Sequence, residues 1–367
     1  MLLVQSKRDD LLAPLQTVSG IVEKRHTLPI LSNVLIEKRA AAITLLATDI
    51  EIQIKTAAQA TDGGDASITV GARKLQDILR ALPETSEVSL LLEDKRLQVR
   101  AGKSRFNLQT LPAADYPRMA TAEDVQVAFE IGQRQLRRLL ALVQYAMAQQ
   151  DIRYYLNGLL LVISGSELQV VATDGHRLAL ASIDIGGSRQ RMDVILPRKT
   201  ITELSRLLSD SDERVEVALA SNQVVFRFDS VELLSKLIDG KFPDYERVVP
   251  QNHPITLTLG RVALLQCLLR AAILTNEKFR GVRLVLADGS LKILSTNAEQ
   301  EEAQEEIEIE YSGEPLDVGF NVNYLLDVLN NVAVDEVECH LHDGSSSALF
   351  TLPGNDRFKY VVMPMRI

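Results

Sequence analysis

Asp174, His176 and Arg177 are the first candidates for chemistry, because they lie together in the stretch VATDGHRLAL. A carboxylate beside an imidazole suits general acid–base catalysis, which would make the protein a hydrolase. The Thr-Asp pair recurs in LATDIEIQI without a histidine, however, and a catalytic pair would not need such a copy. Aspartate also accepts hydrogen bonds from the backbone two residues on and so builds turns. We therefore favour a structural Asp174 and predict no catalytic residue, with a cytosolic hydrolase as the alternative.

The segment VECHLHD holds Cys339, His340 and His342, three residue types that bind metals. Successive side chains of a strand point to opposite faces, so the cysteine would face away from both histidines. The acidic run AEQEEAQEEIEIE is linear, whereas a divalent cation needs carboxylates that converge. The motifs G-x-x-x-x-G-K-[ST], G-x-S-x-G, H-E-x-x-H and C-x-x-C are missing from the sequence. We expect no metal, no cofactor and no enzymatic reaction.

Three landmarks recur along the chain at one interval. The segments LATDIEIQI, VATDGHRLAL and LSTNAEQEEA place Asp49, Asp174 and Asn297 at intervals of 125 and 123 residues. Helical segments ARKLQDILRAL, PRKTITELSRLL and NVNYLLDVLNNV follow in the same order, and TLPAADYP, LIDGKFPDY and YVVMPMRI close the units. Three similarities in one order at one spacing predict an internal threefold repeat, which sets the architecture.

Each repeat predicts the same elements. The apolar spacing favours first helices over 7–19, 133–147 and 261–274, and second helices over 72–82, 197–208 and 321–332. Segments such as NGLLLVIS, ELQVVAT and RVEVALASNQVVFRF predict antiparallel strands. Polar linkers with prolines are expected near 119–126 and 249–254. The fold class is α+β, with domains over 1–122, 127–251 and 252–367, each with two helices packed on antiparallel sheets.

Composition indicates a globular protein of a reducing compartment. Hydrophobic residues make up 46% and charged residues 24% of the chain, which is ordinary for globular proteins. We find neither a run of about 18 apolar residues that would predict a membrane span nor a signal peptide. Cys267 and Cys339 lie in apolar surroundings, as reduced thiols do. We expect a cytoplasmic protein that does not contact a membrane.

The charge pattern separates two kinds of surface. The net charge is −9, and residues 253–367 alone hold 9 basic and 17 acidic side chains. Basic side chains gather on the polar side of three predicted helices, namely Arg73, Lys74 and Arg80, then Arg134, Arg137 and Arg138, then Arg198, Lys199 and Arg206. On a concave surface they would hold duplex DNA through its phosphates without reading its sequence. Unrelated solvated helix faces are the alternative.

The sequence resembles the bacterial DNA polymerase III beta subunit family, the sliding clamps, over its whole length. TLPILSNVLIE, QDIRYYLNG, VATDGHRLAL, DGKFPDYERV, AAILTNEKFRGVRL, GFNVNYLLDVLN and YVVMPMRI carry the resemblance. It implies three tandem clamp-fold domains and a head-to-tail homodimer that forms a ring. The ring would encircle duplex DNA and tether the replicative polymerase, as a non-catalytic processivity factor. A clamp loader, the polymerase III catalytic subunit, and other polymerases and repair proteins with linear clamp-binding peptides are the implied partners.

The resemblance also implies a hydrophobic peptide pocket shared by the second and third domains. In the second domain its residues are Leu156, Thr173, Gly175, His176, Arg177, Leu178, Pro243, Arg247 and Val248. In the third domain they are Ser347, Val361, Val362, Met363, Pro364, Met365 and Arg366. Methionines adapt to different ligands, and arginines can bond peptide carbonyls or a carboxylate. Ser345 stands where a close relative has an apolar residue, so we expect the ranking of peptides to differ from that of the relative. A plain edge strand is the alternative for the C-terminal segment.

DNA and dimer contacts are carried over from the same resemblance. The DNA-binding positions are Arg25, Gln150, Tyr154, Tyr155, Arg198 and Lys199, and a core role is the alternative for Tyr155. The expected dimer interface joins Lys74, Lys103, Arg105, Phe106 and Leu108 of one chain to Ile273, Leu274, Glu299, Glu301, Glu302 and Glu305 of the other. A monomeric repeat scaffold that binds only proteins is the third functional class, beside the clamp and the hydrolase.

Overall fold

The computed structural model describes residues 1–23, 28–60 and 63–367. Its elements run through one order three times: a strand, a helix, further strands, a second helix and closing strands. The first repeat holds β1 (Leu2–Lys7), α1 (Arg8–Ser19), β2 (Asn33–Arg39), β3 (Ala42–Thr48), β4 (Ile52–Gln59), β5 (Ala66–Gly71), α2 (Ala72–Ala81), β6 (Glu87–Glu93), β7 (Arg96–Ala101) and β8 (Ser104–Pro112). The central repeat holds β9 (Val127–Gly132), α3 (Gln133–Ala141), β10 (Gly158–Thr173), β11 (Arg177–Pro197), α4 (Arg198–Leu207), β12 (Arg214–Leu219), β13 (Gln223–Phe228) and β14 (Val231–Lys236). The third repeat holds β15 (Ile255–Gly260), α5 (Arg261–Ala271), β16 (Gly281–Ala287), β17 (Ser290–Thr296), β18 (Glu302–Glu308), β19 (Leu316–Asn321), α6 (Val322–Asn331), β20 (Glu336–Leu341), β21 (Ala348–Leu352) and β22 (Asn355–Val362).

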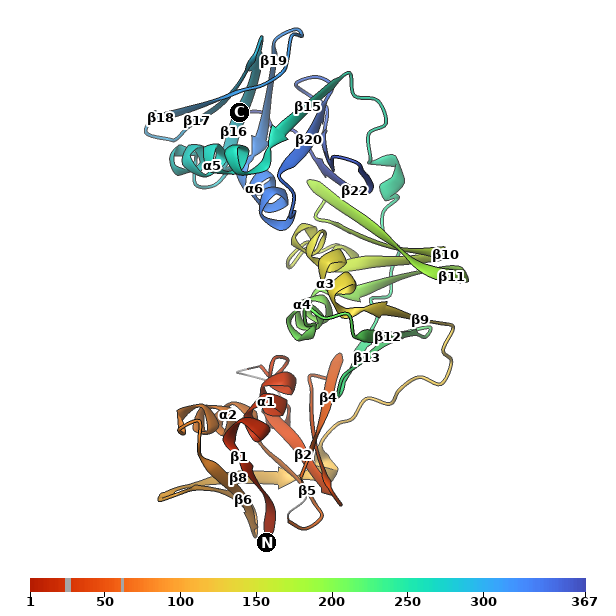
Figure 1. The fold of residues 1–367 in the computed structure, drawn as a ribbon, viewed down its shortest axis with the longest axis vertical. Helices are drawn as coiled ribbons and strands as arrows, with labels where there is room; N and C mark the ends of the chain where they lie inside the picture. Colours follow the sequence, from red (N-terminus) through yellow and green to blue (C-terminus); the bar gives the residue numbers. More distant parts are fainter. Residues whose placement is uncertain (24–27, 61–62) are drawn as a thin grey trace. The chain divides into compact units, whose positions relative to one another are not determined.

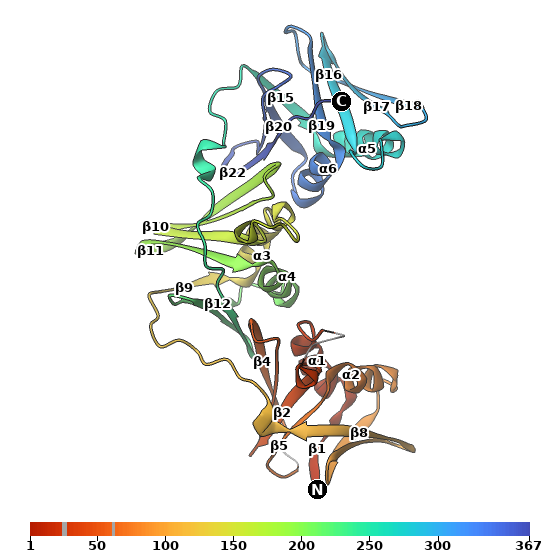
Figure 2. The same cartoon turned by 180° about the vertical axis from the view of Figure 1, so that it is seen from behind.

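The described chain divides into two compact units, of which the first comprises Met1–Gln135 and Thr202–Leu237. Its antiparallel sheet has the strand order β1-β6-β7-β8-β5-β2-β3-β4-β14-β13-β12-β9. Strand β4 of the first repeat pairs with β14 of the central repeat, so the two repeats share one sheet. Helices α1 and α2 lie side by side against the strands of the first repeat (Figures 1 and 2).

The second unit comprises Leu136–Ile201 and Ile238–Ile367. One of its sheets has the order β10-β11-β22-β21-β20-β15, and the other has the order β18-β17-β16-β19. Strands β11 and β22 pair across the central and third repeats, with Arg177 opposite Val362. Strands β10 and β11 pair in two stretches, and their register shifts on both sides of Gly165. Helices α5 and α6 pack against each other beside the second sheet (Figure 1).

Apolar spacing explains the helices. In α5, Leu264, Cys267, Leu268 and Ala271 are buried, which is the i, i+3, i+4, i+7 stripe of a helix with one face in the core. Each expected helix is confirmed to within one residue at its start in the described chain. The first helix of the third repeat ends at Ala271, three residues earlier than expected, and Ala272–Leu274 form a 3-10 turn. The first helix of the central repeat is also shorter than expected, because α3 ends at Ala141 and Gln144–Ala146 form a separate 3-10 turn. That break directs the carbonyl of Tyr145 to Arg177, which lies 2.7 Å away.

The first residue of each first helix holds the end of the second helix in the same repeat. Arg8 donates to the carbonyl of Leu82 (3.0 Å), just after α2. Gln133 accepts from the backbone N–H of Ser209 (2.9 Å), just after α4. Arg261 donates to the carbonyl of Leu329 (3.0 Å) in α6. The carbonyls of Leu82 and Leu329 lie at helix ends, where backbone acceptors lack intrahelical partners. The Ser209 bond makes the corresponding connection in the central repeat, so the helix pair is joined at one end in every repeat.

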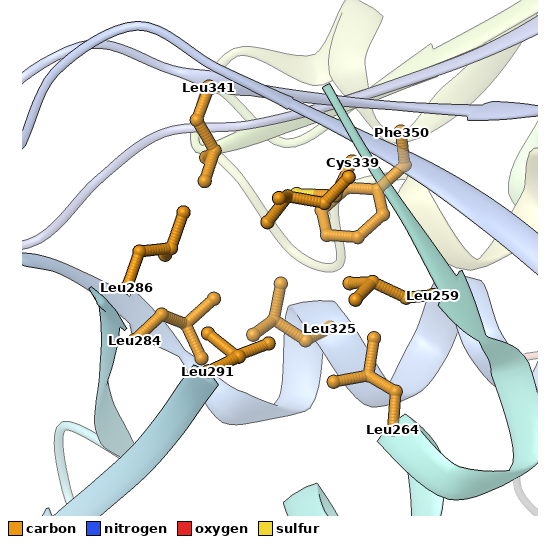
Figure 3. Close-up of a pocket in the computed structure, with 10 residues that line it drawn as sticks. Leu259, Leu264, Leu284, Leu286, Leu291, Leu325, Cys339, Leu341 and Phe350 are labelled. Carbon is orange, nitrogen blue, oxygen red and sulfur yellow. The ribbon is translucent and has the colours of Figure 1, made fainter. Parts of the chain in front are cut away.

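The third repeat has a tightly packed core with one small void. Leucines of β15, β16, β17, α5 and α6 surround the void together with Cys339 and Phe350 (Figure 3). The void is about 10 Å³ in volume and has no polar lining. A water molecule needs at least that space and polar partners, so the void stays dry and offers no ligand site.

Candidate functional site

Residues Thr173–Arg177 form a tight turn between β10 and β11. The Asp174 carboxylate accepts from the backbone N–H groups of His176 (2.9 Å) and Arg177 (3.1 Å). The Thr173 hydroxyl donates to the carbonyl of Arg177 (2.6 Å) and accepts from the N–H of Gly175 (3.1 Å). Gly175 has a φ of +89°, a conformation that glycine adopts without strain.

The same turn exists in the first repeat, where no histidine follows. Asp49 accepts from the N–H groups of Glu51 (2.9 Å) and Ile52 (2.8 Å). Thr48 donates to the carbonyl of Ile52 (2.9 Å) and accepts from the N–H of Ile50 (2.9 Å). The structural role expected for Asp174 is therefore confirmed. Within the described residues, the Asp174 carboxylate makes no hydrogen bond with the His176 ring, so the acid–base pair of a hydrolase is not assembled.

Arg177 turns its guanidinium group into the protein. Nε donates to Asp174 (3.1 Å), Nη2 donates to the carbonyl of Tyr145 (2.7 Å), and Nη1 donates to Asp327 of α6 and to the Tyr360 hydroxyl (3.5 Å). Its side chain is only 10% exposed. Burial lowers the pKa of Arg177, but Tyr360, Asp327 and Asp174 raise it more strongly, so the net pKa lies above the usual value. The guanidinium group of Arg177, which was expected to bond a peptide, instead bonds residues of its own chain.

Three tyrosines enclose this guanidinium group. The ring of Tyr324 lies 4.5 Å from the guanidinium carbon and the ring of Tyr145 lies 5.7 Å from it, both within range of cation–π attraction. The Tyr360 hydroxyl donates to the carbonyl of Tyr324 (2.9 Å). Burial raises the pKa of Tyr145 and Tyr360 far above the ordinary 10. The cluster joins the turn before β11 to α6 and β22 and stays in one charge state at physiological pH.

A buried apolar cluster lies beside this turn. It contains Leu156, Leu178 and Val361, three of the residues expected in the peptide pocket. Phe242, Tyr245 and Val249 from the segment after β14 belong to the same cluster, and Tyr155 packs against it. The core role considered for Tyr155 thus agrees with its packing.

The other expected pocket residues surround this cluster at different depths. Thr173 and Val362 are buried, Ser347, Pro364 and Met365 are half-buried, and Gly175, His176, Pro243, Arg247, Val248, Met363 and Arg366 are exposed. The N–H of Met363 donates to the carbonyl of His176 (2.9 Å), and the N–H of Met365 donates to the carbonyl of Gly319 (2.8 Å). The C-terminal segment is therefore fixed at both the turn and β19, with Met363 at the surface.

Two of the expected DNA-binding residues lie near His176. Gln150, His176 and Arg198 line one open cleft of about 400 Å³. Arg198 donates to the carbonyl of Met147 (2.9 Å), and 125 residues earlier Arg73 donates to the carbonyl of Val22 (2.9 Å). Arg198 thus has a structural task that recurs in the repeat. Lys199 is half-buried and Tyr154 is exposed, and Arg25 lies outside the described residues.

Comparison with known proteins decides the family. Models of the DNA polymerase III beta subunit match in order: its N-terminal domain matches residues 3–120, its central domain residues 130–244 and its C-terminal domain residues 246–366. The chain belongs to the DNA polymerase III beta subunit family. It is 47% identical to the beta sliding clamp of Pseudomonas aeruginosa over 98% of this chain and 99% of that protein. The Escherichia coli beta sliding clamp is 45% identical, again over 98% and 99%. A crystal structure of the Pseudomonas aeruginosa DNA polymerase III subunit beta superposes with a TM-score of 0.95 at 46% identity and covers 100% of both chains.

The residues expected at a beta-subunit dimer interface lie in both units. Lys74, Lys103 and Arg105 are exposed in the first unit, and Phe106 and Leu108 are half-buried on one side of β8. In the second unit, Ile273, Glu299, Glu301 and Glu302 are exposed, and Leu274 is half-buried. Glu305 is bound within its own chain by Arg270, whose Nε lies 2.8 Å from Oε1. In the beta-subunit fold described here, β18 is an edge strand, and β5 pairs with β8 only at Thr110–Pro112.

Several residues of the site have no clear signal in the sequence. Arg153 donates to Asp151 (3.0 Å) and to the carbonyl of Asp174 (3.3 Å), and its hydrogen bonds lower the pKa of Asp151 to about 2. Tyr324 and Asp327 hold Arg177 from α6. Their spacing of three residues indicates one helix face, but it does not indicate what that face meets.

The segment VECHLHD follows the expected strand alternation. Cys339 is buried, and burial raises its pKa to about 12. His340 bonds Thr256 (3.0 Å) and Thr351 (2.7 Å). Across residues 1–23, 28–60 and 63–367 no group of three or more His, Cys, Asp or Glu side chains gathers as a metal site would. No helix in the same ranges has both the length and the apolar character needed to cross a membrane.

Proposed function

We propose that two copies of this sliding clamp close into a ring around duplex DNA and tether the replicative polymerase to its template. The observation that carries the proposal is the match of all three clamp domains, in order, along the chain. A tether needs binding surfaces rather than a reaction, and the Asp174 turn supports this, since its carboxylate is used for backbone hydrogen bonds. We take the domains to be 1–122, 127–251 and 252–367.

The peptide pocket is proposed to bind linear segments of polymerases and repair proteins. Its floor would be Leu156, Leu178 and Val361, which are buried together. Its rim would be formed by exposed groups such as His176, Pro243 and Met363. An apolar floor with few polar groups around it is typical of ligand sites. Arg177 would act as a positioning residue, because its guanidinium group fixes the turn that carries His176.

Head-to-tail dimerisation is supported by two strand edges of opposite charge. Strand β18 is rich in glutamate, whereas Lys103 lies just before β8 and Arg105 is its second residue. Unpaired strand edges readily pair with another chain. Exposed ion pairs contribute only about 0–1 kcal/mol each, so the affinity would come from Phe106, Leu108, Ile273 and Leu274. The charges would select the partner surface, and a clamp loader would open one interface.

DNA is proposed to be held through its phosphates. The chain carries a net charge of −9, so binding depends on local groups such as Gln150, Tyr154, Lys199 and Arg25 rather than on the overall field. Contacts of this kind carry no sequence information and weaken with salt, which permits sliding. Two cysteines in buried positions support a cytoplasmic setting.

The decisive experiment is retention on circular against linear DNA. The clamp is loaded with its loader and ATP onto nicked circular DNA and passed through a sizing column at high salt. We expect retention on the circle and loss after the circle is cut, because only a ring is held by topology. Equal retention on both DNAs, or on neither, would contradict the proposal. Sedimentation at the 40.7 kDa mass of one chain would favour the monomeric scaffold instead.

A further inference from the structure

The first unit contains a cleft that the clamp function does not use. It is about 310 Å³ in volume, which lies within the range of small-ligand sites, and we call it the first cleft. Its lining is Thr48, Ile50, Pro117, Arg118, Met119, Ala120, Gln223 and Lys236. The apolar side chains come from the Asp49 turn and from the segment after β8. That segment also supplies Arg118, whereas Lys236 is the last residue of β14.

Hydrogen bonds align the first cleft with the peptide pocket. The N–H of Lys236 donates to the carbonyl of Glu51 (2.9 Å), just as the N–H of Met363 donates to the carbonyl of His176 (2.9 Å). Glu51 and His176 are 125 residues apart, which is the repeat interval. Lys236 therefore stands where Met363 stands in the peptide pocket.

The strand pairing extends this alignment to the remaining walls. Strand β4 pairs with β14 as β11 pairs with β22. Gln223 lies opposite Lys236, and Ser347 precedes Ala348, whose partner is Val362 next to Met363. Thr48 matches Thr173 in the turn, and Pro117 matches Pro243 in the closing motif. The chain thus builds the frame of its peptide pocket twice.

Ile50 distinguishes the two copies. It occupies the position of Gly175 in the turn, with a φ of +72°, and its side chain is 41% exposed. A β-branched residue in the left-handed region is strained, and such strain gathers at functional sites. Met119 lies beside it and packs on Ala218, Val225 and Leu234. The chain therefore presents an apolar side chain at a position where glycine would fit the backbone better.

We propose that the first cleft is a second docking site, for a linear peptide of a partner protein that carries an aliphatic side chain next to an acidic one. The aliphatic group would cover Ile50 and Met119. The acidic group would meet Arg118 and Lys236, whose present partners are Glu37 (2.9 Å) and Glu51 (3.0 Å) in partly exposed ion pairs. The Lys236–Glu51 pair is a single exposed contact and contributes only about 0–1 kcal/mol. Arg118 holds Glu37 through both terminal nitrogens (3.1 and 2.9 Å), which is a stronger arrangement, so the acidic group would meet Lys236 first. The inference rests on the proposed peptide pocket, because it takes the peptide ligand from that alignment.

Methionine-methyl NMR separates the two sites. The chain has 6 methionines, of which Met119 lies in the first cleft, whereas Met363 and Met365 report on the peptide pocket. The full chain, labelled at its methionine methyl groups, is titrated with the peptide acetyl-Gly-Leu-Leu-Asp-amide. We expect a saturable shift of the Met119 signal, and about tenfold weaker binding when lysine replaces aspartate in the peptide, since charge reversal opposes both cations.

Two variants locate the response. Ile50→Gly, which introduces the residue that the chain itself has at 175, should abolish the Met119 shift and leave those of Met363 and Met365 intact. His176→Ala should leave the Met119 shift unchanged. A Met119 signal that stays still at saturating peptide while Met363 and Met365 move would overturn this inference alone. If none of the three moves, the peptide pocket is overturned with it. A Met119 shift that survives Ile50→Gly also overturns the inference.

Discussion

Replacing Arg177 with methionine tests whether its guanidinium group stabilises the fold or serves a ligand. Methionine keeps much of the length of the side chain and removes the charge and every donor. In the structure, the donors of Arg177 reach Asp174, Asp327, Tyr145 and Tyr360. The substitution should therefore destabilise the second unit, in addition to any effect on peptide binding.

The cost can be worked out from these contacts. A carbonyl of Tyr145 left without its donor costs about 1–3 kcal/mol, and loss of the contact with the Tyr324 ring costs about 1–2 kcal/mol. Asp174 keeps its two backbone donors, and Asp327 is 39% exposed, so water solvates it and its share is only about 0–1 kcal/mol. Packing of the methionine side chain recovers about 1 kcal/mol of the lost stability. The net loss should be about 1–5 kcal/mol, and its midpoint of about 3 kcal/mol lies at the lower end of the ~3–5 kcal/mol of a fully buried broken pair.

Urea unfolding followed by circular dichroism measures this loss, and amide exchange at Met363 reports whether the turn loosens. Arg247→Met is the matched control, because Arg247 is 86% exposed and pairs only at the surface with Asp244. The control should change the unfolding free energy by less than about 0.5 kcal/mol. If Arg177→Met were equally harmless and yet abolished peptide binding, the internal role assigned to Arg177 would be refuted.

Three further predictions concern strain, thiols and pH. Ile50→Gly should raise the unfolding free energy by about 0.5–1 kcal/mol through relief of strain, and Gly175→Val should lower it by about 1–3 kcal/mol, as thermal melting would reveal. Cys339, with a pKa of about 12, should not react with Ellman's reagent at pH 8 until urea is added, and Cys267, whose pKa burial also raises, should react slowly. Burial lowers the pKa of His340 below the ordinary 6.5, so its stabilisation is present above that value and lost as the pH falls below it; His340→Gln should flatten the decline in a pH series of urea unfolding.

The fold was predictable from the sequence because its evidence is local and repeated. The apolar helix stripe at Leu264, Cys267 and Leu268 can be recognised within a few residues. The 125-residue interval lets each element be predicted again from its counterpart in another repeat. The end of α3 was not predictable in this way. In the 3-10 turn beyond it, the Tyr145 carbonyl accepts from Arg177, which is 32 residues away. The apolar spacing within one helix cannot predict a hydrogen bond to a residue so far away in the sequence.

The site was predictable only where the repeat offered a comparison. The role of Asp174 follows from Asp49, which makes the same bonds without a neighbouring histidine. The role of Arg177 does not follow, because its partner Asp327 lies 150 residues further on and has no counterpart in the motif. Arg198 was expected at DNA on the basis of its charge and of the family resemblance. Its counterpart Arg73 reveals a carbonyl-binding task that the two arginines share.

The repeated turn explains how one chain can hold two clefts of different specificity. The Thr and Asp side chains fix the backbone at 48–52 and at 173–177 by the same hydrogen bonds. The two residues after the aspartate, Ile50 and Glu51 in one copy and Gly175 and His176 in the other, use only their backbone groups for the turn. The side chains of Ile50, Glu51 and His176 are therefore not needed to form the turn. They stand at the surface, beside Lys236 in one case and Met363 in the other. A change at these positions alters what the cleft offers a ligand while the frame that holds the cleft stays the same.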